Sequence, residues 1–315
     1  MNGPSGKQYI FILGAPRSGT TWLHHMVAAH PAVASVKEEL TVIKYVSDWD
    51  RRYQREKYHI DQGHWQQGMP LLYHEEEFYN GLRTLAVHAY SRVLDKRPLA
   101  ACVLDKHPLY ALHIPLIHRI FPEAKVLHII RDGREVAVSM MSAKKRIGFG
   151  EGEIKGAAWD WARHVAEARR EGGKLGPDRY LELRYEDLME GTAPCMGTVF
   201  DFCGLPTSGE QVQQIAAEYS IENKQVSRGD ASLNALRNTP GAIWKAKLSL
   251  RERWTLDRVA GHLLLELGYA KPGWWAANAI DRLRMWPYPW AGRVLNTLGS
   301  AKHTWNSQGR SCMQA

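Results

Sequence analysis

Residues 9–30 constrain the fold of this chain more than any other stretch. An apolar run from Tyr9 to Leu13 is too short for a helix and is rich in residues that favour a buried strand. Residues 14–19 (Gly-Ala-Pro-Arg-Ser-Gly) form a turn, and apolar residues then recur at helical spacing. A strand, a glycine loop and a helix start direct backbone N–H groups and the positive end of a helix dipole at one anion. The sequence therefore predicts a phosphate-binding cradle.

The loop departs from the nucleotide-hydrolase P-loop at one position. Gly14 and Gly19 have the spacing of that motif, but Thr20 stands where the motif has lysine. Since that lysine reaches the β- and γ-phosphates, its absence argues against ATP or GTP chemistry. A cation lies inside the loop instead, at Arg17. We therefore expect a shorter anion with a charged side chain beside it.

Residues 15–22 (Ala-Pro-Arg-Ser-Gly-Thr-Thr-Trp) resemble the 5′-phosphosulfate loop of sulfotransferases that use 3′-phosphoadenosine 5′-phosphosulfate (PAPS). The arginine form is similar to the tyrosylprotein and bacterial branches, because the cytosolic small-molecule branch usually has lysine there. The tryptophan is similar to one that contacts adenine in the cytosolic branch. The resemblance implies that PAPS is bound in this loop by Arg17, Ser18, Gly19, Thr20, Thr21 and Trp22.

A second stretch, residues 126–139, resembles the 3′-phosphate motif of the same family. Residues 125–130 predict the clearest buried strand of the chain, and residues 135–141 continue as a helix. Arg131 ends the strand, and Ser139 follows eight residues later, two helical turns on. Both side chains can therefore bind the same phosphate group.

Two weaker resemblances add candidates on the nucleotide side. Tyr185 belongs to a Tyr-Glu-Asp-Leu element whose tyrosine lies near the nucleotide in the family. Arg237 lies in a weakened form of the loop that closes over the 3′-phosphate in the cytosolic branch, with asparagine and threonine where that loop has lysine and glycine. The whole resemblance covers residues 8–270.

Charged residues at predicted strand ends are candidates for catalysis. Glu38 follows Arg17 by 21 residues, which resembles the spacing of the catalytic base in tyrosylprotein sulfotransferases, and Glu39 is the alternative if the register slips by one. Lys106, in Asp-Lys-His-Pro, resembles a lysine that meets the sulfate. The next residue, His107, is a second choice of base, as in the cytosolic branch. By composition alone, such charges usually belong to solvated turns.

Composition limits the remaining choices. The 315 residues carry a net charge of +8, which suits an anionic ligand, a nucleic acid or a membrane surface. The four cysteines are scattered, without zinc spacing, so we expect no metal and a reducing compartment. No apolar run approaches the roughly 20 residues of a membrane span. Because the first strand begins near residue 8, leaving no room for a signal peptide, we expect a cytoplasmic protein.

The order of elements predicts an α/β fold with a parallel sheet flanked by helices, similar to P-loop nucleotide hydrolases and sulfotransferases. We expect a sulfotransferase domain at residues 1–271 and a basic, Trp-rich extension at residues 272–315. Residues 272–305 either pack on their own domain or contact a membrane peripherally. We expect residues 40–98 to be helical in outline but poorly periodic, with long surface loops and short helices at 49–53 and 59–74.

Taken with these patterns, the resemblance implies a PAPS-dependent sulfotransferase of the EC 2.8.2 type, with no metal and no nucleic-acid partner. A sulfuryl group passes in line to a hydroxyl acceptor while Glu38 takes the proton, and Arg17 and Lys106 stabilise the leaving phosphate. A glycan, a glycolipid or another small metabolite is the favoured acceptor. The alternatives are a peptidyl-tyrosine sulfotransferase, a P-loop kinase of a small molecule, and a non-catalytic nucleotide-binding module at a membrane surface. Acceptor identity and oligomeric state stay open.

Overall fold

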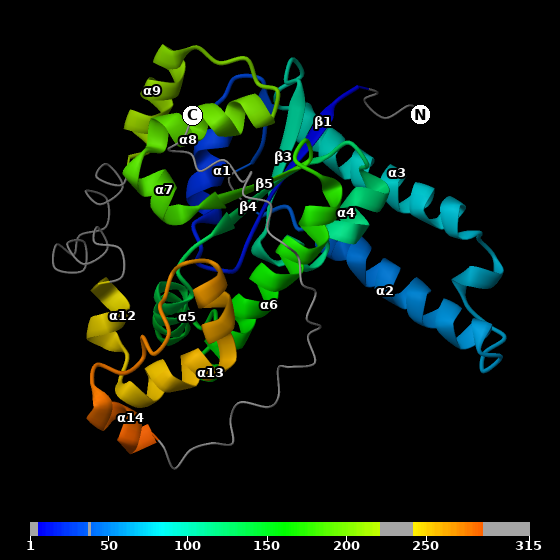
Figure 1. Ribbon diagram of the computed structural model, residues 1–315. Coiled ribbons are helices and arrows are strands. Elements are labelled where there is room, and N and C mark those ends of the chain that lie inside the picture. Colours follow the sequence, from blue (N-terminus) through cyan, green and yellow to red (C-terminus); the bar gives the residue numbers. More distant parts are fainter. Residues whose placement is uncertain (1–5, 37–38, 221–241, 286–315) are drawn as a thin grey trace.

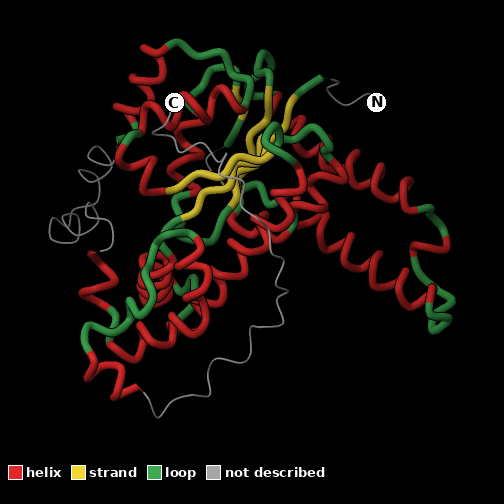
Figure 2. Tube along the Cα trace, in the orientation of Figure 1, coloured by secondary structure: helices red, strands yellow, loops and turns green. Residues whose placement is uncertain are grey.

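The fold is built on a central five-stranded parallel sheet. The computed structural model describes residues 6–36, 39–220 and 242–285 (Figure 1). The strands follow the order β2-β3-β1-β4-β5, and all neighbouring pairs are parallel. They are β1 (Gln8–Leu13), β2 (Val33–Ala34), β3 (Cys102–Lys106), β4 (Lys125–Ile130) and β5 (Tyr180–Arg184). This architecture confirms the predicted α/β class, and Figure 2 shows the strands at the centre of the molecule.

Helices surround this sheet. The α-helices of the first half are α1 (Thr20–Ala28), α2 (Val42–Asp61), α3 (Glu75–Leu94), α4 (Ile114–Ile120), α5 (Gly133–Ile147) and α6 (Ile154–Gly172). Those of the second half are α7 (Tyr185–Glu190), α8 (Thr192–Phe202), α9 (Gly209–Glu218), α12 (Ala242–Lys247), α13 (Leu250–Glu266) and α14 (Ala279–Met285). Three short 3₁₀ helices lie among the described residues: η1 (Met69–Leu71), η2 (Pro108–Leu112) and η3 (Gly173–Leu175).

Side-chain alternation along β1 creates two apolar cores. Phe11 and its neighbours two residues away pack with α2, α3 and α4 on one face. Ile10 and Ile12 pack with α1, α8 and α9 on the other face. Because both faces are covered, β1 reads as a continuous apolar run rather than an alternating one. A third cluster joins α5, α6, α12 and α13 around the fully buried Trp161.

A helical hairpin corrects one sequence expectation. Residues 49–53, expected to form surface loops and short helices, lie inside the 20-residue helix α2, and α3 returns beside it as an arm that extends from the sheet (Figure 1). The ring of Tyr53 stacks on Phe78, with centroids 4.0 Å apart, and Tyr79 donates to Asp50 at 2.5 Å. The two helices stabilise each other through these contacts between their side chains. The poorly periodic sequence of either helix alone does not reveal such contacts.

The third strand carries Lys106 at its carboxyl end. β3 runs from Cys102 through Lys106, and its five residues are all buried. The residues that follow form η2 and α4, and the break between them falls at His113, two residues before Pro115. Lys106 is therefore fixed by the sheet rather than carried on a free turn.

The predicted domain boundary at residue 271 stays a prediction. Trp274, beyond it, meets Trp244 edge to face at a centroid distance of 5.2 Å. On α14, Ile280 and Leu283 are exposed. Residues 286–315, with most of the expected extension, lie outside the described residues. Within the described part of the chain, no helix has the length and apolarity to cross a membrane.

Two leucines test the core assignment. Leu104 on β3 is fully buried, whereas Leu85 on α3 is 53% exposed. We expect Leu104→Ala to lower the free energy of unfolding by about 2–5 kcal/mol, because it removes buried methyl groups and leaves a cavity. The matched Leu85→Ala should change it by less than about 0.5 kcal/mol. Urea unfolding measures both, and equal losses would contradict the assignment.

Candidate active site

The loop between β1 and α1 forms the predicted cradle at the carboxyl edge of the sheet. Two of its glycines are required by close approach: a Cβ on Gly14 would lie 2.4 Å from the carbonyl oxygen of Ile129, and one on Gly19 would lie 2.6 Å from the ring of Tyr185. Gly14 and Gly19 also have positive φ angles, of 150° and 103°. Any larger residue would push the loop away from β4 and α7.

The interior of the cradle suits an anion. Ser18 is fully buried, and its hydroxyl has no hydrogen-bond partner among the described residues. Thr20, also buried, is the first residue of α1, and the first turn of that helix contains no acidic residue. A buried hydroxyl and a helix N-terminus both favour a bound phosphate or sulfate group.

Cations and aromatic rings from other elements reach this loop. The Nε of Arg17 donates to the hydroxyl of Ser139 on α5 at 3.1 Å. Arg131, at the end of β4, lies over the ring of Tyr185 at 4.3 Å. The same ring meets Trp22 of α1 at a centroid distance of 5.5 Å. The first loop, the β4 end and the β5 end therefore form one continuous surface.

A charged cluster lies on the other side of the cradle. Lys106 is 5% exposed, and its Nζ contacts Oε1 of Glu39 at 2.6 Å and the hydroxyl of Thr21 at 3.2 Å. The second carboxylate oxygen of Glu39 is 3.2 Å from Nε2 of His107. Burial lowers the pKa of His107, the Glu39 carboxylate opposes this shift, and the Lys106 ammonium adds to it. The cluster joins the end of β3, the start of α1 and the segment before α2.

A buried aspartate next to Lys106 supports this cluster through hydrogen bonds. Asp105 accepts hydrogen bonds from the hydroxyls of Tyr90 at 2.7 Å and Tyr110 at 2.8 Å. Tyr110 in turn accepts one from the backbone N–H of Ile43, in the first turn of α2, at 3.3 Å. Burial raises the pKa of Asp105, and these hydrogen bonds oppose the shift. The strand end that carries Lys106 is thus tied to the helix that follows Glu39.

Most sequence-predicted residues are brought together. Those in contact within the site are Arg17 with Ser139, Lys106 with Thr21, and Tyr185 with Gly19, Trp22 and Arg131. Ser18 and Thr20 lie in the same loop. Glu38 and Arg237 lie outside the described residues. Glu39, the alternative to Glu38, is the carboxylate that contacts Lys106.

Two glutamates that support the site were missed. Glu135 on α5 accepts hydrogen bonds from the backbone N–H groups of Ile243 and Trp244, and burial raises its pKa. Glu186 on α7 accepts from the N–H of Asp132 at 3.0 Å and from the hydroxyl of Tyr269 at 2.9 Å. These partners are distant in sequence, so no local pattern could have revealed them. No group of three or more candidate metal-ligating side chains occurs among the described residues.

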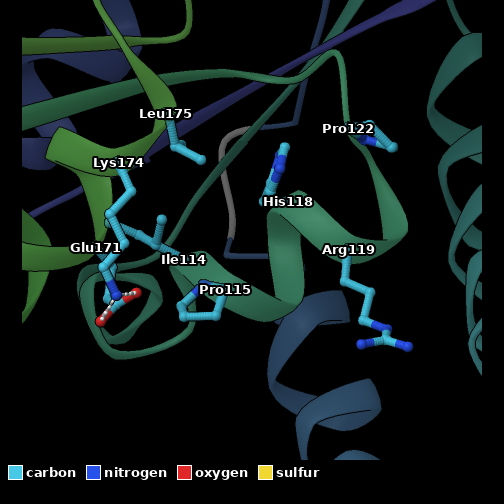
Figure 3. Close-up of a pocket in the computed structure, with 8 residues that line it drawn as sticks. All are labelled: Ile114, Pro115, His118, Arg119, Pro122, Glu171, Lys174 and Leu175. Atoms are coloured by element: carbon cyan, nitrogen blue, oxygen red, sulfur yellow. Dashed lines mark hydrogen bonds and ion pairs between the residues drawn. The ribbon is translucent and has the colours of Figure 1, made fainter.

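A surface groove elsewhere does not belong to this site. It has a volume of about 490 Å³ and lies between α4 and the end of α6, with His118 and Arg119 on one wall and Lys174 on the other (Figure 3). Lys174 pairs with Glu171 of the same wall. None of the cradle residues lines it.

The buried histidine beside the cluster makes stability depend on pH. Nε2 of His24 is 2.7 Å from the hydroxyl of Ser35, and burial, Lys106 and His25 lower its pKa from 6.5 to about 4. Between these values the unfolded chain binds a proton that the folded chain does not, so the free energy of unfolding falls as pH falls.

We therefore expect His24→Gln to make this dependence shallower by up to about 1.4 kcal/mol per pH unit, because glutamine has no titrating proton. Urea unfolding at several pH values between 6.5 and 4 measures the slope. His262→Gln, at an exposed position on α13, is the matched control. Equal slopes in the two variants would contradict the shift.

Comparison with known proteins identifies the family. The profile of the sulfotransferase family matches residues 9–209. A putative protein-tyrosine sulfotransferase of Caenorhabditis briggsae is 24% identical over 269 residues, which are 84% of this chain and 89% of that protein. An uncharacterized protein of Aquifex aeolicus is 27% identical over 236 residues, which are 72% of this chain but only 30% of that protein.

Solved structures agree in fold. The sulfotransferase domain of the olefin synthase from Synechococcus PCC 7002 has a TM-score of 0.52 and 20% identity, over 86% of this chain and 99% of that domain. A mouse sulfotransferase complexed with PAP, the desulfated form of PAPS, has a TM-score of 0.50 and 13% identity, over 89% of each chain. With the family match over residues 9–209, the chain belongs to the sulfotransferase family and is a sulfuryl-transferring enzyme.

Proposed function

We propose that the cradle binds PAPS and that the enzyme transfers its sulfuryl group to a hydroxyl acceptor. The observation that carries this proposal is the convergence of Arg17, Lys106 and Arg131 around a helix N-terminus without acidic residues. Three cations at a helix N-terminus suit a ligand with two separate anionic groups. The mouse sulfotransferase of similar fold was solved with PAP bound, which supports the choice of nucleotide.

The two anionic groups fit different parts of the surface. The first-loop backbone, Ser18 and Arg17 would hold the 5′-phosphosulfate, and Arg131 with Ser139 would hold the 3′-phosphate. The edge formed by Trp22 and Tyr185 would receive the adenine ring. Arg237, the remaining candidate for the 3′-phosphate, stays a prediction.

Glu39 is the described carboxylate that is suited to act as general base. Its side chain is 38% exposed, whereas Lys106 beside it is 5% exposed, so an acceptor reaches Glu39 from solvent while Lys106 faces the cradle. Glu39 takes the hydroxyl proton as the acceptor oxygen bonds to sulfur. The bond from sulfur to the phosphate oxygen breaks, and its electron pair leaves with the phosphate. Lys106 and Arg17 stabilise that developing charge.

The acceptor is proposed only by class. The relatives named protein-tyrosine sulfotransferases make a phenolic hydroxyl a reasonable probe. A glycan, a glycolipid or another small metabolite, which the sequence analysis favoured as acceptor, stays a prediction beside the phenolic hydroxyl. Simple phenols therefore serve as test acceptors, because their hydroxyl pKa can be varied without changing their shape much.

The nucleotide site is tested by titration with PAP. We expect Arg131→Ala to weaken PAP binding about 10-fold or more, because a charge-assisted contact to the 3′-phosphate is lost. Arg119→Ala, in the groove between α4 and α6, is the control and should bind PAP like the unaltered enzyme. Isothermal titration calorimetry measures both affinities. Binding of ATP with Mg²⁺ in preference to PAP would favour a kinase and contradict the proposal.

The base is tested by two matched variants. We expect Glu39→Gln to lower kcat for transfer from PAPS to phenol by about 10²-fold or more, because the amide accepts no proton. PAP affinity should stay unchanged, since the carboxylate serves the acceptor. Glu38→Gln is the comparison, and initial rates with radiolabelled PAPS measure both. A loss confined to Glu38→Gln would move the role of the base to Glu38.

A further inference from the structure

His107 has a hydrogen-bond partner at each ring nitrogen. The backbone N–H of Leu109 donates to Nδ1 at 3.1 Å, and this hydrogen bond also caps the N-terminus of η2. On the opposite side of the ring, Nε2 lies 3.2 Å from Oε2 of Glu39. The ring is buried, and it packs against Tyr110 with centroids 5.3 Å apart. His107 therefore has little freedom to turn.

These partners determine where the imidazole carries its proton. A backbone N–H can only donate, so Nδ1 must present a lone pair to Leu109. Because Nδ1 carries no proton, the ring is neutral and its single proton lies on Nε2. Burial, which lowers the pKa of the ring, acts in the same direction. The resulting N–H points at the carboxylate of Glu39.

The two oxygens of Glu39 consequently have different partners. Oε2 faces the fixed N–H of His107, which belongs to a rigid ring at the end of a buried strand. Oε1 faces Lys106, whose ammonium also reaches Thr21 and so borders the cradle. A ligand anion in the cradle would compete with Oε1 for that ammonium, whereas the two ring nitrogens of His107 face Glu39 and Leu109.

We propose that His107 is a positioning residue that holds Oε2 of Glu39, so that Oε1 is the atom that receives the acceptor's proton. This inference rests on the proposed function of Glu39. His107 is not itself the base, because its one lone pair is used by Leu109 and its other nitrogen is already protonated. Fixing a catalytic carboxylate in one orientation raises kcat, since small misplacements of reacting groups are costly.

Two substitutions separate the contacts of His107. His107→Asn keeps an oxygen that accepts from Leu109 N–H, as asparagine does at helix N-termini, but it is too short to reach Glu39. His107→Gln is long enough for its amide to donate to Glu39. We expect the asparagine variant to lose about 10-fold or more in kcat with phenol while keeping PAP affinity and Tm. The glutamine variant should recover most of that rate.

A second acceptor provides a readout that a purely structural role would not move. At mildly alkaline pH, 4-nitrophenol is largely ionised and needs no base, so His107→Asn should lose much less of the rate with it than with phenol. Equal losses with both phenols, or an asparagine variant as fast as the wild type with phenol, would overturn the proposal. If His107 were the base, both variants would lose activity and Glu39→Gln would keep it.

The tautomer is measured without any acceptor. In the ¹⁵N spectrum of histidine-labelled protein, the His107 signals are those that His107→Asn removes. We expect the pattern of a neutral ring protonated at Nε2, and a ring protonated at Nδ1 would overturn the inference. Failure of the wild-type enzyme to bind PAP would instead contradict the proposed function. The ¹⁵N spectrum does not depend on PAP binding, so the two failures can be told apart.

Discussion

A buried ammonium is the constraint around which the candidate site is arranged. Lys106 is 5% exposed, and removing a charge from water is costly unless other groups replace the lost hydration. Glu39 and Thr21 do so from two different segments. We propose that this cation at the end of β3 serves where the loop after β1 has no lysine. Three segments that are distant in sequence are thereby fixed around one charge.

The sheet explains why the motifs gather at one edge. All five strands run parallel, so the ends of β1, β3, β4 and β5 lie along the same edge. The strand order also reverses there: the chain leaves β1 toward β2 and leaves β4 toward β5, on opposite sides. Ligands of open parallel sheets bind outside the carboxyl ends of the strands at such a switch point. The topology of the sheet alone therefore brings the candidate site residues to one edge.

Local sequence patterns predicted those parts of the candidate site that are formed by residues close together in the chain. The first loop, and the strand and helix that carry Arg131 and Ser139, each lie within one sequence window in which a strand is followed directly by a helix. The length of α2 and α3 and their pairing as a hairpin were not predicted, because Tyr53 and Phe78 stabilise each other from separate helices. The roles of Asp105 and Glu186 were equally hidden, since their partners come from other elements. The choice between Glu38 and Glu39 depends on one residue of register after a short strand, which periodicity does not fix.

We propose that Lys106 stabilises the charge that develops on the leaving phosphate rather than merely holding Glu39 in place. Sulfuryl transfer from PAPS to 4-nitrophenol tests it most directly, because an ionised acceptor does not need the base. With Lys106→Met we predict a loss of about 10²-fold or more in kcat, well beyond any weakening of PAP binding measured by calorimetry. A rate with 4-nitrophenol close to that of the wild type would contradict the account.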